Sequence, residues 1–275
     1  MTGGRVADPE PVDGPAAPAF CTDDALSYRR SLTRFVPGEG LALDEAYRRA
    51  HLPLVAPDHP GVIPCREGWY DARGRHPRIV SLVLPVPHAR LLASEAYAEL
   101  DRELRAARFA GKIAWDVATR RAERLHATLC GSLASGPDAV PALAPEQEAA
   151  LAALGPVTVE LRGLFSGAVN VGRLYLPVYP EARDGTDILS EVQRIMGRPP
   201  TGLYVVGLHN LTDDLDPPEA AALAALIARW RDRPILRLTL DALWLLWAHD
   251  DLVLDGGVLA RVPLTAGAAR LPRSA

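Results

Sequence analysis

The sequence predicts an α+β protein with a bilobal, duplicated fold, in which two small and mainly antiparallel sheets backed by helices surround a central cleft. The main observation is an order of strand, helix, motif-bearing strand, helix and strand that occurs twice between residues 79 and 262. Each copy places a short motif of His or Asn with Thr on a strand, and the two motifs are too far apart for a stacking solenoid repeat. An apolar content of 48% with 23% charged residues is typical of a globular chain with a sizeable core.

The composition divides the chain into four parts. Residues 1–19 are rich in Gly, Pro, Ala and Asp, so we expect a disordered tail there. Residues 20–77, interrupted by many prolines and glycines, are expected to form an N-terminal extension packed on the body, with a short helix at 42–51. Residues 78–265 form the expected bilobal domain, and 266–275 a C-terminal tail.

Local signals define the elements of the first half. An aliphatic and β-branched run before Pro85 predicts the first strand, and Ser94 is a suitable N-cap for the first helix. Pro145, with acidic residues in the following turn, begins another helix. The expected elements are strands at 79–84, 124–130 and 157–165, and helices at 94–108 and from residue 145.

The second half repeats this order. Gly197 ends its first helix, because glycine adopts the left-handed conformation that closes a helix. Asp216 and Glu219, three residues apart around two prolines, have the pattern of a capping box. The expected elements are strands at 172–178, 203–212, 236–247 and 258–262, and helices at 187–196 and 216–230.

Charge and cysteine content restrict the partners and the compartment. A net charge of −4 argues against binding of duplex DNA by bulk electrostatics, although a small or short phosphate-bearing substrate remains compatible with it. The three cysteines are widely spaced and odd in number, and no signal peptide or long apolar run is present. We therefore expect a cytoplasmic protein that does not bind membranes.

The first motif lies at residues 125–129. Alternation along a strand places His126 and Thr128 on one face and the intervening Ala127 on the core side. An imidazole transfers protons near neutral pH, and a hydroxyl with nearby amides holds a phosphate oxygen. The motif therefore predicts phosphate chemistry, against the simpler interpretation that His126 is a hydrogen-bonded strand histidine in a structural domain.

The two motifs, Arg124–Leu129 and Gly207–Thr212, and the element order over residues 78–265 resemble the 2H phosphoesterase superfamily, which includes RNA 2',3'-cyclic phosphodiesterases and 2'-5' RNA ligases. The resemblance implies that each half supplies a His-x-Ser/Thr motif, with one histidine as general base and the other as general acid. It also implies that hydroxyl residues bind phosphate and that no metal or other cofactor takes part. His126 and Thr128 match this motif as they stand.

The second motif departs from the family pattern and leaves two registers open. If His209 takes the histidine position, the hydroxyl position is Leu211, which cannot bind phosphate. If Thr212 takes the hydroxyl position, the histidine position is Asn210, whose amide donates hydrogen bonds but does not transfer protons. Strand alternation favours Asn210 with Thr212, and a bulge at Gly207 would reconcile the two registers.

Other residues are candidates for substrate binding. Tyr175 and Tyr204 lie on expected strands, where they either stack on a base or pack in the core. Arg124, two residues before His126, is the preferred phosphate contact from a basic stretch that precedes the motif. This stretch comprises Arg102, Arg105, Arg108, Lys112, Arg120, Arg121 and Arg124. The histidines show no spacing typical of zinc ligands, so no metal site is expected.

The function that these observations favour is a metal-independent phosphodiesterase. Its substrate would be a nucleotide or a short RNA with a 2',3'-cyclic or related phosphodiester end. His126 would be the principal acid/base group, with Thr128, Asn210 and Thr212 holding the phosphate. The alternative is a catalytically degenerate 2H-like fold that binds a nucleotide or a protein, since Asn210 cannot replace a general acid or base.

Overall fold

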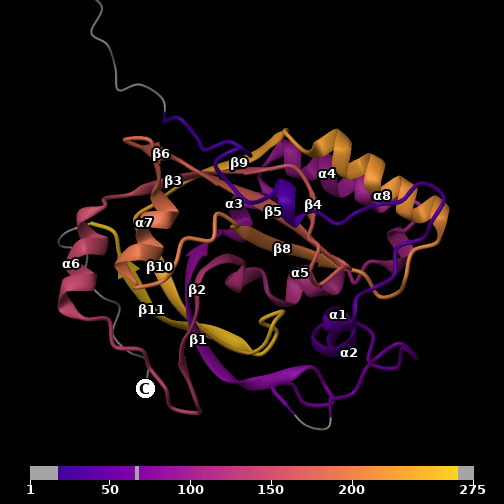
Figure 1. The fold of residues 1–275 in the computed structure, drawn as a ribbon, viewed down its shortest axis with the longest axis horizontal. Coiled ribbons are helices and arrows are strands. Elements are labelled where there is room, and N and C mark those ends of the chain that lie inside the picture. The colour runs from indigo at the N-terminus through magenta and orange to yellow at the C-terminus, as the bar shows by residue number, and fades with distance from the viewer. Residues whose placement is uncertain (1–17, 66–67, 266–275) are drawn as a thin grey trace, which may run out of the picture.

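The computed structural model describes residues 18–65 and 68–265. Nine of its strands join into one sheet, in the order β11-β10-β1-β2-β8-β5-β3-β9, with β4 paired to β5 (Figure 1). These strands are β1 (Arg75–Pro85), β2 (His126–Ser135), β3 (Val157–Arg162), β4 (Phe165–Ser166), β5 (Arg173–Pro180), β8 (Val205–Asn210), β9 (Pro234–Leu240), β10 (Ala242–Asp250) and β11 (Gly256–Pro263). A separate two-stranded sheet pairs β6 (Ala182–Arg183) with β7 (Thr186–Asp187).

The predicted α+β class is confirmed, and the strand pairs of the described chain are antiparallel. The expected division into two small sheets is not confirmed, because β2 and β8 pair and join all the larger strands in one sheet. This sheet is strongly curled. Asp241 alone separates β9 from β10, although these strands are far apart in the sheet order, so the two ends of the sheet come together.

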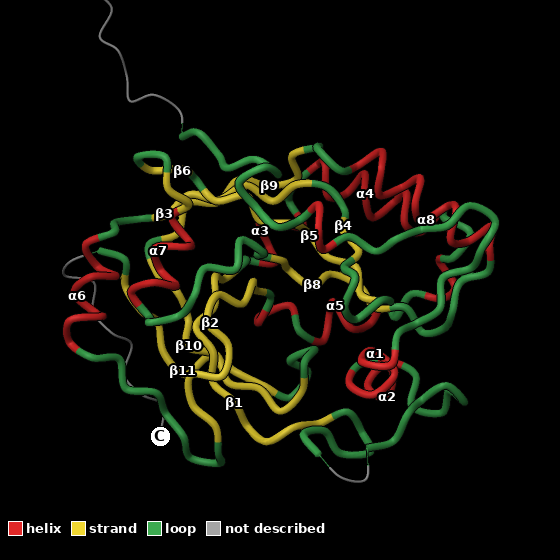
Figure 2. Tube along the Cα trace, viewed as in Figure 1, coloured by secondary structure: helices red, strands yellow, loops and turns green. Residues whose placement is uncertain are grey.

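Helices surround the curled sheet (Figure 2). The longest, α4 and α8, lie side by side, where Glu103 accepts hydrogen bonds from Arg229 and from the indole of Trp230 at 3.0 Å. The helices are α1 (Glu45–Ala50), α2 (Leu52–Val55), α3 (His88–Leu92), α4 (Glu95–Ala106), α5 (Asp116–Arg120), α6 (Pro145–Ala153), α7 (Ile188–Ile195) and α8 (Pro217–Trp230), with short 3-10 turns at Arg29–Ser31, Ala110–Lys112 and Ala122–Arg124.

The N-terminal segment, residues 18–65, contributes to the main core. Leu26, Tyr28, Tyr47 and Leu52 are buried in the same apolar cluster as the strands of the sheet. Residues 1–17 of the expected tail and all of the expected C-terminal tail lie outside the described residues. No helix of the described chain is long and apolar enough to cross a membrane.

Candidate functional site

The two motif strands lie next to each other at the middle of the sheet order. Ala127 of β2 pairs with Val206 of β8, and both are buried on the core side. Since neighbours along a strand alternate, His126 and Thr128 point to the opposite face, as predicted. His126 is partly buried and Thr128 is exposed. The first motif therefore presents its two polar side chains on one face of the sheet.

The hydrogen bonds of His126 define which ring nitrogen is free to act as a base. Nδ1 lies 2.6 Å from the carbonyl oxygen of Arg124, which can only accept, so Nδ1 carries the proton of the neutral ring. Nε2 consequently holds the lone pair. Burial lowers the pKa of His126 to about 4, and the charges of Arg121 and Arg173 act in the same direction. At neutral pH the ring is therefore an uncharged base.

A bulge in β8 decides the register of the second motif. Leu174 of β5 pairs with His209, but the next residue, Tyr175, pairs with Gly207, so Leu208 is an extra residue. Past the bulge, Arg173 pairs with Asn210. Directly paired residues share a face, so Asn210, Arg173 and Tyr175 lie on the face of His126.

His209 lies on the other face of the sheet. Its ring meets Trp115 edge to face, with centroids 5.0 Å apart, and its side chain is only 2% exposed. Burial lowers the pKa of His209 to about 4, so this ring is also neutral. The structure thus turns Asn210, and not His209, to the face of the sheet that carries the first motif, which is the favoured register.

Two arginines supply positive charge to this face. Arg121 is buried and donates through Nη2 to the carbonyls of Gly207 and Leu208, the two residues of the bulge. Arg173 lies over the ring of Tyr175, with its guanidinium carbon 5.3 Å from the ring centroid. Burial, and after it the charge of Arg173, lower the pKa of Arg121. We call Arg121, His126, Arg173, Tyr175 and Asn210 the central polar cluster.

Several atoms of the central polar cluster are buried without a partner. Both atoms of the Asn210 amide, and Nε of Arg121 and of Arg173, have no hydrogen-bond partner among the described residues. An unpaired buried polar group is costly, so such groups are normally satisfied by water or a ligand. The unpaired donors of two arginines and an amide suit an anionic oxygen.

The remaining predicted site residues have other roles. Arg124 is a correction: it belongs to a 3-10 turn, and its guanidinium donates to four main-chain carbonyls, those of Arg120, Val253, Leu254 and Gly256. Tyr204 takes the core-packing role of its two expected alternatives, because it is fully buried and its hydroxyl donates to Asp187 at 2.7 Å. Thr212 follows β8, and its main-chain N–H donates to the carbonyl of Lys112 at 2.8 Å.

A pocket of about 330 Å³ adjoins the central polar cluster through Tyr175. Phe165, Val169 and Val205 give it an apolar wall, and Arg30 of the N-terminal segment adds a charged group. Sequence reasoning found Tyr175 but not the pocket, because the other walls come from distant parts of the chain. Among residues 18–65 and 68–265, no three His, Cys, Asp or Glu side chains are grouped to hold a metal ion.

Gly207 allows Arg173 to cross the strand. A Cβ atom built on Gly207 would collide with the guanidinium of Arg173. We expect Gly207→Ala to displace this guanidinium at a small cost in stability, about 1 kcal/mol, because the end of a long side chain can move. Phosphate affinity, measured by calorimetry, should fall, whereas Gly111→Ala, at a glycine with nothing within 4 Å and no left-handed backbone, should leave it unchanged. Unchanged affinity in Gly207→Ala would show that the position of Arg173 is unimportant.

Comparisons with known proteins give little similarity. No protein-family model matches the sequence, and no curated protein matches it. Among solved structures, the chain is similar to TT0787 of Thermus thermophilus, with 14% identity and a TM-score of 0.34 over 70% of this chain and 100% of that chain. A likeness of this degree defines neither the fold nor the activity of the chain.

Proposed function

We propose that this protein is a phosphodiesterase that needs no metal and acts on a 2',3'-cyclic or related phosphodiester of a nucleotide or RNA end. The observation that carries the proposal is the juxtaposition of a neutral histidine with two arginines and an amide on one face. His126 has a lone pair on Nε2, and Arg121, Arg173 and Asn210 have unpaired donors. Phosphodiester hydrolysis needs a base that removes a proton from water and a group that stabilises the negative charge on the phosphoryl oxygens.

In the proposed reaction, Nε2 of His126 removes a proton from the attacking water. The two arginines neutralise the charge that builds on the phosphoryl oxygens, and Asn210 adds a hydrogen bond to them. The buried setting of Arg121 strengthens these contacts, because charge interactions weaken in water. The 330 Å³ pocket beside Tyr175 offers an apolar and aromatic surface for a base next to the phosphate.

The strand order supports the resemblance to the 2H phosphoesterases. Along the main strand order, four strands lie on each side of the boundary between β2 and β8, which bear the two motifs, and β4 adds to the β8 side through β5. We infer that the two groups correspond to the lobes expected from the sequence, with β3 of the first copy and β10 and β11 of the second copy exchanged between them. Cytoplasmic location remains part of the proposal, and free thiols at Cys21, Cys65 and Cys130 are compatible with it.

Hydrolysis assays test the proposal. The substrates are 2',3'-cyclic mononucleotides, short RNAs with cyclic ends and cyclic dinucleotides, separated by chromatography in the presence of EDTA. We expect wild type to turn over at least one of them, and His126→Ala to lose about 10²–10⁴-fold in rate, as expected for loss of an acid/base group. Turnover that needs a metal, or that survives in His126→Ala, would refute the proposed chemistry.

One observation favours a binding protein as the second candidate. Asn210 stands where the family resemblance places a second histidine, while His209 packs against Trp115 on the other face. An amide does not transfer protons, so a protein with this motif alone would hold a nucleotide without cleaving it. Tight binding of a cyclic nucleotide, with no product after long incubation of folded protein, would establish this alternative.

A further inference from the structure

Asp251, which follows β10, connects groups from distant parts of the chain. Its carboxylate accepts a hydrogen bond from the Tyr70 hydroxyl at 2.7 Å and lies 3.5 Å from Nε2 of both His51 and His76. Its main-chain carbonyl accepts a hydrogen bond from Nη1 of Arg173 at 3.1 Å. Burial alone would raise the pKa of Asp251, but the contacts with His51, His76 and Tyr70 hold it well below its usual range. Asp251 is therefore an anion shared by two histidines at the edge of the central polar cluster.

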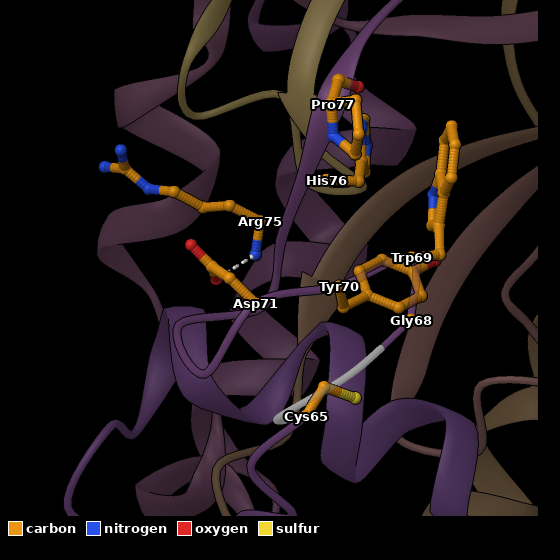
Figure 3. A pocket seen from close by; sticks show the side chains of 8 residues that line it. All are labelled: Cys65, Gly68, Trp69, Tyr70, Asp71, Arg75, His76 and Pro77. Carbon is orange, nitrogen blue, oxygen red and sulfur yellow. Dashed lines mark hydrogen bonds between the residues drawn. The ribbon is translucent and has the colours of Figure 1, made fainter.

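The two histidines around Asp251 have different surroundings. His76 lines a pocket of about 400 Å³, where the ring of Trp69 stacks on it with centroids 5.7 Å apart (Figure 3). Nδ1 of His76 lies 2.8 Å from the carbonyl oxygen of Pro77, so this ring has one hydrogen bond, although its Nε2 has none among the described residues. His51, in contrast, is completely buried, and neither of its ring nitrogens has a hydrogen-bond partner among the described residues.

Tyr47 connects His51 to the second motif. The ring of Tyr47 meets that of His51 at a centroid distance of 5.0 Å. Its hydroxyl donates a hydrogen bond to the carbonyl of Leu211 at 2.6 Å, immediately after Asn210. Helix α1, which contains Tyr47, thus places His51 near the end of β8, where a second catalytic histidine is missing.

His51 and His126 are subject to the charges of the same two arginines, Arg121 and Arg173. Burial and these two charges lower the pKa of His51, while Asp251 raises it. An anionic phosphate held by the arginines would offset their charge and favour a protonated His51.

We propose that His51 is the second proton-transfer group of the site, supplied by the N-terminal segment in place of the histidine that the second motif lacks, with Asp251 as its positioning residue. This inference rests on the proposed phosphodiesterase function. A carboxylate beside Nε2 stabilises the imidazolium, as in other carboxylate–histidine pairs. With Asp251 beside Nε2, the other ring nitrogen, Nδ1, carries the proton that is transferred to the substrate. Nδ1 has no hydrogen-bond partner among the described residues.

The step balances as an acid–base hydrolysis. The oxygen of water forms a bond to phosphorus while its proton passes to Nε2 of His126. The bond from phosphorus to the leaving ribose oxygen breaks, and that oxygen takes the proton of Nδ1 of His51. The products are a phosphomonoester and a hydroxyl group. Exchange with solvent then removes the proton from His126 and returns one to His51.

The role of His51 is tested by measuring the pH dependence of kcat for His51→Gln. The substrate is the cyclic nucleotide that wild type hydrolyses. A required base gives a limb that rises with pH, and a required acid gives a limb that falls with pH. We expect wild type to show both limbs. His51→Gln should lose about 10²–10⁴-fold in kcat, keep its KM and lose the falling limb. A merely structural role would lower activity at every pH and leave both limbs in place.

Two further variants complete the test. Asp251→Asn keeps the imidazole but removes the neighbouring negative charge, so the falling limb should move to lower pH; this variant carries the test if His51→Gln does not fold. His59→Gln is the matched control, because His59 lies in the same segment but pairs with Asp213 at 3.0 Å. It should behave as wild type.

The outcomes separate this inference from the proposed function. A falling limb retained in His51→Gln, or unmoved in Asp251→Asn, would overturn the role of His51 and leave the phosphodiesterase function standing. Absence of turnover by folded wild type would overturn both.

Discussion

Arg173→Met is expected to lower kcat/KM for a cyclic nucleotide by about 10³–10⁵-fold, the range found for arginines that stabilise phosphoryl transfer. Arg173 reaches across Gly207 and lies over Tyr175 on the face of His126. Its Nε is buried without a partner among the described residues, so a donor is free for a phosphoryl oxygen. Methionine keeps much of the packing but removes the charge and all the donors. Steady-state kinetics with the substrate identified for wild type measure the effect.

Two other substitutions control for charge and for nonspecific effects. Arg173→Lys keeps the charge but loses the planar fork, so its activity should lie between those of wild type and Arg173→Met. Arg261→Met removes a half-exposed arginine of β11 that contacts Asp241 at 3.4 Å, and it should match wild type. If Arg173→Met stays within tenfold of wild type, Arg173 does not hold the phosphate.

Local signals in the sequence predict most elements of the fold. The capping box at Asp216 and Glu219 is present, with each side chain accepting a hydrogen bond from the other residue's main-chain N–H. Such contacts span three residues, so the sequence alone determines them.

The single strand expected at 236–247 is wrong in one respect. Asp241 divides it into β9 and β10, which pair with β3 and β1. That division depends on the curl of the sheet, which no local pattern encodes.

The features of the candidate site also fall into two groups, those that local sequence predicts and those that depend on distant contacts. Alternation on one strand is enough to predict that His126 and Thr128 share a face. The selection of Arg124 from the basic stretch fails, because its distance from His126 in sequence says nothing about the four carbonyls that it meets. The sequence alone does not identify Arg173 and His51 as site residues, for a related reason. Arg173 depends on the bulge opposite it, and His51 depends on a helix that docks more than 150 residues away in the chain, as the contact of Tyr47 with Leu211 shows.

The largest stability effect is expected at Tyr28, because this residue anchors the N-terminal segment in the core. Its ring packs against Phe165 and Tyr179, with centroids 5.7 and 5.2 Å away. Its hydroxyl lies 2.7 Å from the carbonyls of Val178 and Tyr204 and accepts a hydrogen bond from the Val178 N–H. Tyr28→Ala should therefore lower the free energy of unfolding by about 3–5 kcal/mol, as for other buried aromatic residues.

Urea denaturation measures the free energy of unfolding of three variants, Tyr28→Ala, Tyr28→Phe and Val36→Ala. Their comparison shows whether the N-terminal segment is part of the cooperative core or only contacts its surface. Tyr28→Phe keeps the ring and should cost about 1–3 kcal/mol through unsatisfied main-chain groups. Val36 is 39% exposed, so Val36→Ala should change stability by less than about 0.5 kcal/mol. A Tyr28→Ala variant as stable as Val36→Ala would mean that the segment adds nothing to the core. A loss in the expected range would mean that the fold itself holds His51 in place, because the segment that carries this histidine then unfolds only with the sheet.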